Sequence, residues 1–202
     1  MSVTVHPLTA ADVVVVDPML TAAYERPASM ANTLSSYLQL QPDGWFLARY
    51  DGVPVGMGGV IIYGDLARIG LVATHPDYQR RGIGRLVMEH LLRWASDRGA
   101  TTVRLDASPV GAPLYSRLGF VTDDYVQVYV CPASFMGAVA ATRAASAADG
   151  VAPLRLAHLP EVIAFDSERF GADFSQTSLG REWRQGEGKD RAGGVRGRSK
   201  RC

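Results

Sequence analysis

Apolar and polar positions follow a helical period over the first part of the chain. After a short strand expected at Val3–His6, apolar side chains recur at helical spacing over Ala10–Tyr24 and again from Pro27 to about Leu40. Thr9 suits the N-cap of the first helix, because its hydroxyl can accept from free N–H groups. Pro18 lies inside that helix and has no N–H to donate, so we predict a kink or a break there.

The next part of the chain has the pattern of an antiparallel meander. Alternating apolar residues predict strands at Trp45–Tyr50, Val53–Tyr63 and Ala67–Thr74. The pairs Asp51-Gly52 and Gly64-Asp65 separate these strands and are typical of tight hairpin turns. Glycines inside the second strand predict a bulge or a close packing contact there, and they are Gly56, Gly58 and Gly59.

Helical and extended patterns alternate after the meander. We expect a helix at Arg85–Arg98 that ends at Gly99, because glycine readily adopts the left-handed conformation of a helix C-terminus. A strand at Thr102–Leu105, a short helix at Ala112–Leu118 and a last strand at Tyr125–Val130 follow. This order predicts a mixed α+β fold, with a central, mostly antiparallel twisted sheet flanked by helices.

The composition is that of a soluble globular protein. The chain has 202 residues, 47% of them hydrophobic and 20% charged, and its formal net charge of +1 at pH 7 gives no indication of a nucleic-acid or membrane partner. Cys131 and Cys202 form neither a disulfide framework nor a metal-binding motif, so we expect no metal. Met1–Leu8 lacks the features of a signal peptide, and we expect a cytoplasmic location.

Composition divides the chain into four parts. We expect a folded domain over 1–131, an alanine-rich linker over 132–150 and the start of a truncated second domain over 151–174. The remainder, 175–202, is rich in glycine, holds eight Lys/Arg against three Asp/Glu, and is expected to be disordered. Two interpretations of this tail remain open: out-of-frame translation of the gene, or a basic arm that binds RNA or acidic surfaces.

A loop punctuated by glycines gives the first chemical indication. The segment Gln79–Gly84 (QRRGIG) precedes the predicted helix at Arg85–Arg98. A helix N-terminus presents unpaired N–H groups and a positive dipole end, and Gly82 and Gly84 would let an anion such as pyrophosphate approach closely. A Rossmann fingerprint would need Gly or Ala at Val87, and a Walker A loop would need Gly-Lys-Ser/Thr, so neither motif fits.

Two segments, in this order, resemble the motifs of one family. The stretch Thr74–Gly84 (THPDYQRRGIG) closely resembles the coenzyme A motif of the GNAT superfamily of N-acetyltransferases, whose core is Gln/Arg-x-x-Gly-x-Gly/Ala. Further along, Ala112–Phe120 (APLYSRLGF) resembles the family's Leu-Tyr-x-x-x-Gly-Phe element. The resemblance covers Val3 to about Val130. It implies a GNAT-like sheet whose strands splay apart around Thr74 and Leu105 to admit an acyl-CoA thioester.

The resemblance also assigns residues that bind acetyl-CoA. It implies that the pantetheine arm bonds the backbone of Val72–Thr74 and that the loop Arg80–Arg85 holds the pyrophosphate. The implied cofactor-binding residues are Val72, Ala73, Thr74, Arg80, Arg81, Gly82, Ile83, Gly84, Arg85 and Ser108. Ser108 stands where many members of the family carry an asparagine and is shorter, so its contact with the cofactor is an open question.

Catalytic residues follow from the second motif. Tyr115 matches the tyrosine that commonly protonates the leaving thiolate in this family, although by position alone it could equally pack its ring in an amphipathic helix. A positioned acid of this kind contributes about 10²–10⁴-fold to a rate. The general base is not evident. Asp106, at a strand end, is the first candidate, and Asp65, His75, Glu89 or a chain of waters are alternatives.

These motifs together predict an acyltransferase. The resemblance implies an acetyl-CoA-dependent N-acetyltransferase that transfers the acetyl group to a primary amine by direct attack on the thioester. The acceptor would be a small-molecule or peptide amine, bound by the first two helices, Ala10–Leu40. The alternatives are a non-catalytic acyl-CoA-binding or regulatory module and a truncated remnant that folds poorly. We leave open whether the chain forms a homodimer.

Overall fold

The protein is described by a computed structural model that covers residues 3–127, 129 and 155–170. These residues belong to two compact units, one with 3–105 and 163–170 and the other with 106–127, 129 and 155–162. The expected linker, 132–150, and the expected tail, 175–202, lie outside the described residues, as does part of the expected second-domain start. Across the described ranges no helix is long and apolar enough to cross a membrane.

Five strands form one sheet in the first unit. They lie in the order β1 (Val3–Pro7), β2 (Trp45–Tyr50), β3 (Val53–Tyr63), β4 (Leu66–Thr74) and β5 (Thr102–Leu105). Neighbouring strands from β1 to β4 pair antiparallel, whereas β5 pairs parallel to β4. The predicted meander and the mixed α+β class, with a mostly antiparallel sheet, are therefore confirmed.

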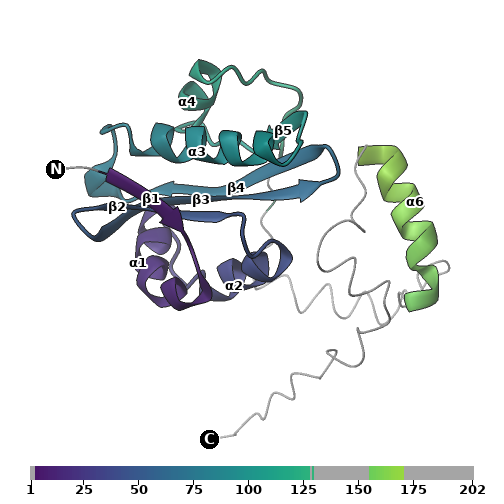
Figure 1. Ribbon diagram of the computed structural model, residues 1–202, viewed down its shortest axis with the longest axis horizontal. Helices are drawn as coiled ribbons and strands as arrows, with labels where there is room; N and C mark the ends of the chain where they lie inside the picture. The colour runs from purple at the N-terminus through teal and green to yellow at the C-terminus, as the bar shows by residue number, and fades with distance from the viewer. Residues whose placement is uncertain (1–2, 128, 130–154, 171–202) are drawn as a thin grey trace, which may run out of the picture. The chain divides into compact units, whose positions relative to one another are not determined.

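Helices cover both faces of this sheet (Figure 1). In the first unit, α1 (Val13–Ala23) and α2 (Ala31–Leu40) lie on one face and α3 (Ile83–Asp97) lies on the other. Short 3-10 turns precede two of them, η1 (Ala10–Asp12) before α1 and η2 (Pro76–Tyr78) before α3. The remaining helical segments are α4 (Ala112–Arg117), η3 (Leu156–His158) and α6 (Leu159–Phe170).

The predicted break at Pro18 does not occur, and α1 continues through it. Pro18 cannot donate to the carbonyl of Val14, one turn earlier. Because Val14 is 80% exposed, water can bond that carbonyl instead. The opposite side of α1, with Val16 and Leu20, is fully buried, and its packing compensates for the missing hydrogen bond.

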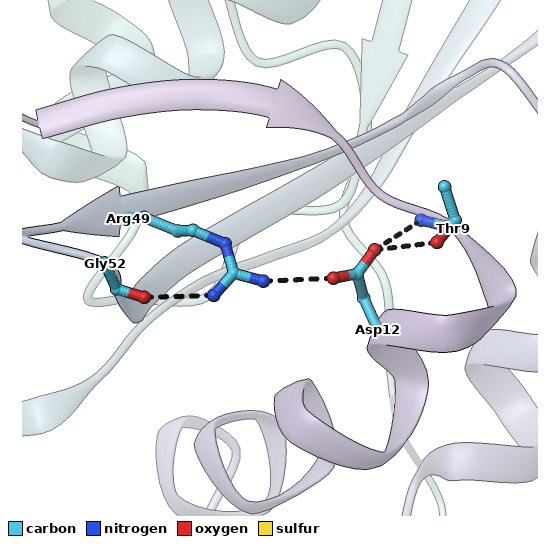
Figure 2. Close-up of polar contacts among 4 residues, drawn as sticks. All are labelled: Thr9, Asp12, Arg49 and Gly52. Carbon is cyan, nitrogen blue, oxygen red and sulfur yellow. Dashed lines mark hydrogen bonds and ion pairs between the residues drawn. The ribbon is translucent and has the colours of Figure 1, made fainter.

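A polar network joins the start of α1 to the β2–β3 hairpin (Figure 2). The carboxylate of Asp12 accepts hydrogen bonds from the backbone N–H and the hydroxyl of Thr9, at 3.0 and 2.8 Å. Its other oxygen pairs with Arg49 at 3.0 Å, and Arg49 also donates to the carbonyl of Gly52. Thr9 thus lies at the helix start, as predicted, but there its hydroxyl donates to Asp12. The hydrogen bonds from Thr9 contribute most to a lowered pKa of Asp12, and Arg49 lowers that pKa further.

The glycines of β3 let both helical layers pack closely on the sheet. Gly59 faces Trp45, whose ring atoms lie 2.0–2.3 Å from the place that a Cβ would take. On the other face, the side chains of α3 fill the equivalent space beside Gly56 and Gly58. The register of β3 with β4 also shifts between Met57 and Gly59. The predicted close packing and the predicted irregularity are both confirmed.

The predicted last strand at Tyr125–Val130 is wrong for the residues of it that are described. Residues 125–127 and 129 have no regular secondary structure. Tyr125 and Tyr129 are each 86% exposed, and Val126 is 69% exposed. The alternating pattern fits a strand, but a strand also needs hydrogen-bonding neighbours, which a local pattern cannot supply. Residues 128 and 130 lie outside the described residues.

Candidate functional site

The loop between β4 and α3 has the backbone conformation that its glycine predicts. β4 ends at Thr74, η2 follows, and α3 begins at Ile83 after Gly82. Gly82 has φ 80° and ψ 0°, a left-handed conformation that glycine adopts without a steric cost. A Cβ at Gly82 would meet nothing within 4 Å, so the space above this residue is open. The loop therefore leaves the helix N-terminus accessible from outside.

The N-terminus of α3 can bind an anion. The first helical hydrogen bond runs from the N–H of Leu86 to the carbonyl of Gly82, at 3.0 Å. The N–H groups of Ile83, Gly84 and Arg85 come before it, where a helix has no carbonyl to offer them. The dipole adds the equivalent of about half a positive charge at this end. The free N–H groups and the positive end of the helix dipole thus both favour a small anion here, as in phosphate-binding helix N-termini.

Three arginines flank this helix end, and all are exposed. Arg81 places its guanidinium over the ring of Tyr78, 5.1 Å from the ring centroid. Arg85 pairs with Glu89 one turn along α3, with Nε 2.7 Å from Oε1. Arg80 has φ 64°, so it turns the chain in a left-handed conformation that is costly for a residue with a Cβ. The predicted positive charge therefore lies around the helix N-terminus. Glu89 partly balances the charge of Arg85.

Two of the candidate bases have structural partners. Nδ1 of His75 accepts from the N–H of Asp77 at 3.2 Å, which starts the turn η2. Asp65 precedes β4 and accepts from Thr101 at the start of β5. Because β4 spans Leu66–Thr74 and rises about 3.3 Å per residue, Asp65 lies at the end of that strand remote from the loop. Glu89 likewise pairs with Arg85, so each of the three alternatives to Asp106 has a structural contact.

β4 extends beyond its pairing with β5 next to the loop. The pairing of the two strands ends at Ile69 with Leu105, while β4 continues to Thr74. Leu71 has φ 49°, and the pairing of β4 with β3 jumps there, which marks a bulge. Val72, Ala73 and Thr74 thus lie on a strand segment that β5 does not pair with among the described residues. The splaying expected around Thr74 and Leu105 stays a prediction, and the structure shows that the β4–β5 pairing ends at Leu105, the last residue of β5.

Asp106, Ser108 and Tyr115 belong to the second unit, whereas the loop and β4 belong to the first. Ser108 accepts from the N–H of Gly111 with both its hydroxyl, at 3.2 Å, and its carbonyl, at 3.0 Å, so it shapes the start of α4. Asp106 is exposed and directly follows β5. Each of the three lies on the chain where the sequence analysis expected it, in the segment from the end of β5 to α4.

Tyr115 lies on α4 and is half-buried. Its ring packs on Gly111, where a Cβ would lie 2.9 Å from the ring, and it meets Phe120 edge-on with centroids 6.1 Å apart. Burial raises the pKa of the Tyr115 phenol. The hydroxyl therefore stays protonated through the neutral range, which is the state that a proton donor needs. No metal-binding group of His, Cys, Asp or Glu occurs in the part of the chain that the structure describes.

The sequence analysis missed one contact at β4. The hydroxyl of Tyr24, at the end of α1, donates to the carbonyl of Val72 at 3.3 Å. The two residues are 48 positions apart. Neither the helical period around Tyr24 nor the strand period around Val72 carries a signal for such a pair, because the pairing depends on how α1 packs against the sheet.

Known relatives match the central part of the chain. The uncharacterized N-acetyltransferase YitH of Bacillus subtilis is 37% identical over 73 residues, which are 36% of this chain and 25% of that protein. The [ribosomal protein bS18]-alanine N-acetyltransferase of Salmonella typhimurium is 41% identical over 59 residues, 28% of this chain and 40% of that protein. The chain therefore spans a quarter to two fifths of the length of these curated relatives.

Solved structures and a family model place the fold. The aminoglycoside enzyme AAC(6')-Iy, solved in complex with a bisubstrate analogue that contains CoA, superposes with a TM-score of 0.54 over 65% of this chain and 99% of its own. At 18% identity this likeness concerns the fold alone. The model of the acetyltransferase (GNAT) family matches residues 15–120, which include the β4–α3 loop and α4. The chain therefore belongs to the GNAT acetyltransferase family.

Proposed function

We propose that this protein is an acetyl-CoA-dependent N-acetyltransferase that transfers the acetyl group to a primary amine. The observation that carries the proposal is the pairing of two features in the first unit. The glycine-started helix α3 offers free N–H groups to a diphosphate, and β4, the strand that leads into the loop before it, extends over Val72–Thr74 beyond its pairing with β5. A ligand with a diphosphate and an extended amide-containing arm matches both features, and coenzyme A has both.

The proposed donor site uses the backbone more than side chains. The N–H groups of Ile83, Gly84 and Arg85 would bond the pyrophosphate, and the backbone of Val72–Thr74 would bond the pantetheine arm as an added strand would. Arg80 and Arg81 would add charge close to the phosphates. Backbone recognition of this kind depends on the shape of the loop, so we expect the left-handed Gly82 to matter more than the identity of any one side chain.

The proposed reaction is direct transfer. The nitrogen of a neutral amine attacks the thioester carbon and forms the C–N bond, and the tetrahedral intermediate then breaks its C–S bond. The sulfur leaves as a thiolate, which takes a proton from Tyr115. We assign Asp106 as the base that removes the proton of the amine, directly or through water. The raised pKa of Tyr115 supports its role, because the phenol stays protonated at neutral pH and can donate a proton there.

For the acceptor, we propose an α-amine of a protein or peptide as the first class to test. The name of the Salmonella relative states that it acetylates an alanine of a ribosomal protein, and that relative is 41% identical over the matched 59 residues. The first two helices, α1 and α2, would form the acceptor side, because they cover the face of the sheet opposite α3. Small-molecule amines are the second class.

An acetyl-transfer assay with the full chain tests the proposal. Acetyl-CoA would be supplied with a panel of peptide α-amines, lysine side chains, polyamines and aminoglycosides, and free thiol would be measured. We expect thiol release that depends on one class of amine, together with a matching mass gain of one acetyl group on that amine. Binding of coenzyme A without thiol release for any amine would favour the alternative, a non-catalytic acyl-CoA-binding module. Absence of binding would reject both.

A further inference from the structure

The contact between Tyr24 and Val72 lies at the edge of β4 that β5 does not pair with. The backbone N–H of His75 donates to the carbonyl of Val55 on β3, at 2.9 Å. Backbone groups alternate along a strand, so the N–H of Ala73 also faces β3. The carbonyl of Val72 shares a trans peptide with that N–H and points the opposite way, toward the edge that β5 leaves unpaired. The hydroxyl of Tyr24 meets this carbonyl at 3.3 Å.

Tyr24 is held in place by the end of α1. The N–H of Arg26 bonds the carbonyl of Thr21 at 2.9 Å, and that of Glu25 bonds Ala22 at 3.4 Å, the two hydrogen bonds of a Schellman C-cap. Glycine usually occupies the left-handed position of this motif, but here Glu25 does, with φ 51°. A second contact holds the segment after α1, because the carboxylate of Asp17 on α1 accepts from the N–H of Met30 at 2.7 Å.

Left-handed residues thus flank both ends of the contact. Glu25 follows Tyr24 in the chain with φ 51°, and Leu71 precedes Val72 with φ 49°. Residues with a Cβ adopt this conformation at a cost, and they keep it only where the surrounding structure holds them. Such strained residues concentrate at functional sites. The presence of such residues on both sides of the Tyr24–Val72 hydrogen bond indicates that this bond contributes to function as well as to folding.

We propose that Tyr24 is a positioning residue of the acyl-donor site, an inference that rests on the proposed function. Its hydroxyl fixes the carbonyl of Val72, and with it the peptide plane of Val72 and Ala73, at the edge of β4 beyond the β5 pairing. The N–H groups of Val72 and Thr74, which flank this peptide and alternate with that of Ala73, then face the pantetheine arm in a fixed orientation. Without the hydroxyl, that peptide must be ordered when the donor binds, and affinity for the donor falls.

The test compares Tyr24→Phe with a matched control in the full chain. Tyr37 on α2 is 37% exposed, against 38% for Tyr24, and Tyr37→Phe removes the same atom from the same layer. The dissociation constant for coenzyme A would be measured by calorimetry, and KM would be measured separately for acetyl-CoA and for the amine. We expect Tyr24→Phe to weaken coenzyme A binding by about fivefold, the effect of one net hydrogen bond. The KM for acetyl-CoA should rise with it, while the KM for the amine stays that of the wild-type chain and the melting temperature stays that of the Tyr37→Phe control.

Distinct results separate this inference from the proposed function. If the wild-type chain does not bind coenzyme A, both are overturned. If the wild-type chain binds and Tyr24→Phe binds equally well, only the role of Tyr24 is rejected. A melting temperature for Tyr24→Phe well below that of Tyr37→Phe would assign the hydrogen bond to folding and would likewise overturn the inference.

Discussion

The Cγ2 atom of Ile83 lies 2.7 Å from the position that a Cβ on Gly56 would occupy. Gly56 is on β3 and Ile83 is the first residue of α3, so the missing side chain lets the helix N-terminus lie directly against the sheet. Further along the same helix, Val87 and Leu91 come within 3.0 and 2.9 Å of the equivalent position at Gly58. The glycines of β3 therefore set how deep α3 lies and where its N–H groups are presented.

Substitution of Gly56 by alanine tests this packing. The added methyl group would meet Ile83 at 2.7 Å and the carbonyl of Ala73 at 3.1 Å, so something must move. We expect a loss in the free energy of unfolding of about 1–3 kcal/mol, as for other overpacked cores. Urea denaturation would measure it. Gly70→Ala is the control, because a Cβ there meets nothing within 4 Å. Equal stability of the two variants would contradict this account.

Gly82→Ala and Gly99→Ala separate backbone strain from anion binding. Both glycines flank α3, have φ near 80° and leave open space where a Cβ would go. Each alanine variant should therefore lose about 1 kcal/mol of folding stability. Only Gly82→Ala changes the loop at the helix N-terminus, so only that variant should bind coenzyme A more weakly. Calorimetric titration would decide, and equal weakening by both variants would count against the proposed pyrophosphate site.

Tyr115→Phe tests the proposed acid. Removal of the phenol's hydroxyl group should lower kcat by about 10²–10⁴-fold. Coenzyme A should still bind as tightly as to the wild-type chain. Tyr125→Phe, at an 86% exposed tyrosine of the same unit, is the matched control and should keep full activity. The raised pKa of Tyr115 also predicts that activity does not fall through loss of this proton until the pH exceeds about 10. Unchanged turnover in Tyr115→Phe would remove the tyrosine from the mechanism.

Asp12 should stabilise the fold in a pH-dependent way. Its pKa is lower in the folded protein, chiefly because Thr9 donates to the carboxylate and also because Arg49 lies beside it. The stabilisation is therefore complete above the unfolded pKa of about 3.9 and is lost as pH falls through the lower folded value. At neutral pH, Asp12→Ala should cost about 1–2 kcal/mol in urea denaturation. The difference from the wild-type chain should shrink as pH falls below the unfolded pKa of about 3.9 and through the lower folded value, and a constant difference would refute the assignment.

Local patterns were enough for much of the fold. The alternation over 45–74 predicted strands that the structure contains, and Asp51-Gly52 and Gly64-Asp65 form turns between them. Gly99 follows α3 with φ 82°, as a helix-ending glycine should. Each of these features depends on a few neighbouring residues, whose conformational preferences are written in the sequence. Where a local rule met its surroundings it sometimes failed, as at Pro18, whose helix is held by the packing of its buried side.

The sequence by itself determined the order of elements from β1 to α4, the glycine-started helix of the candidate anion site and, through two motifs, the family. Tertiary structure alone decided that the β4–β5 pairing ends at Ile69, that Leu71 takes a left-handed conformation and that Tyr24 reaches Val72. The physical reason is range: turn and helix preferences act over a few residues, whereas strand register and side-chain contacts depend on how segments far apart in the chain pack together.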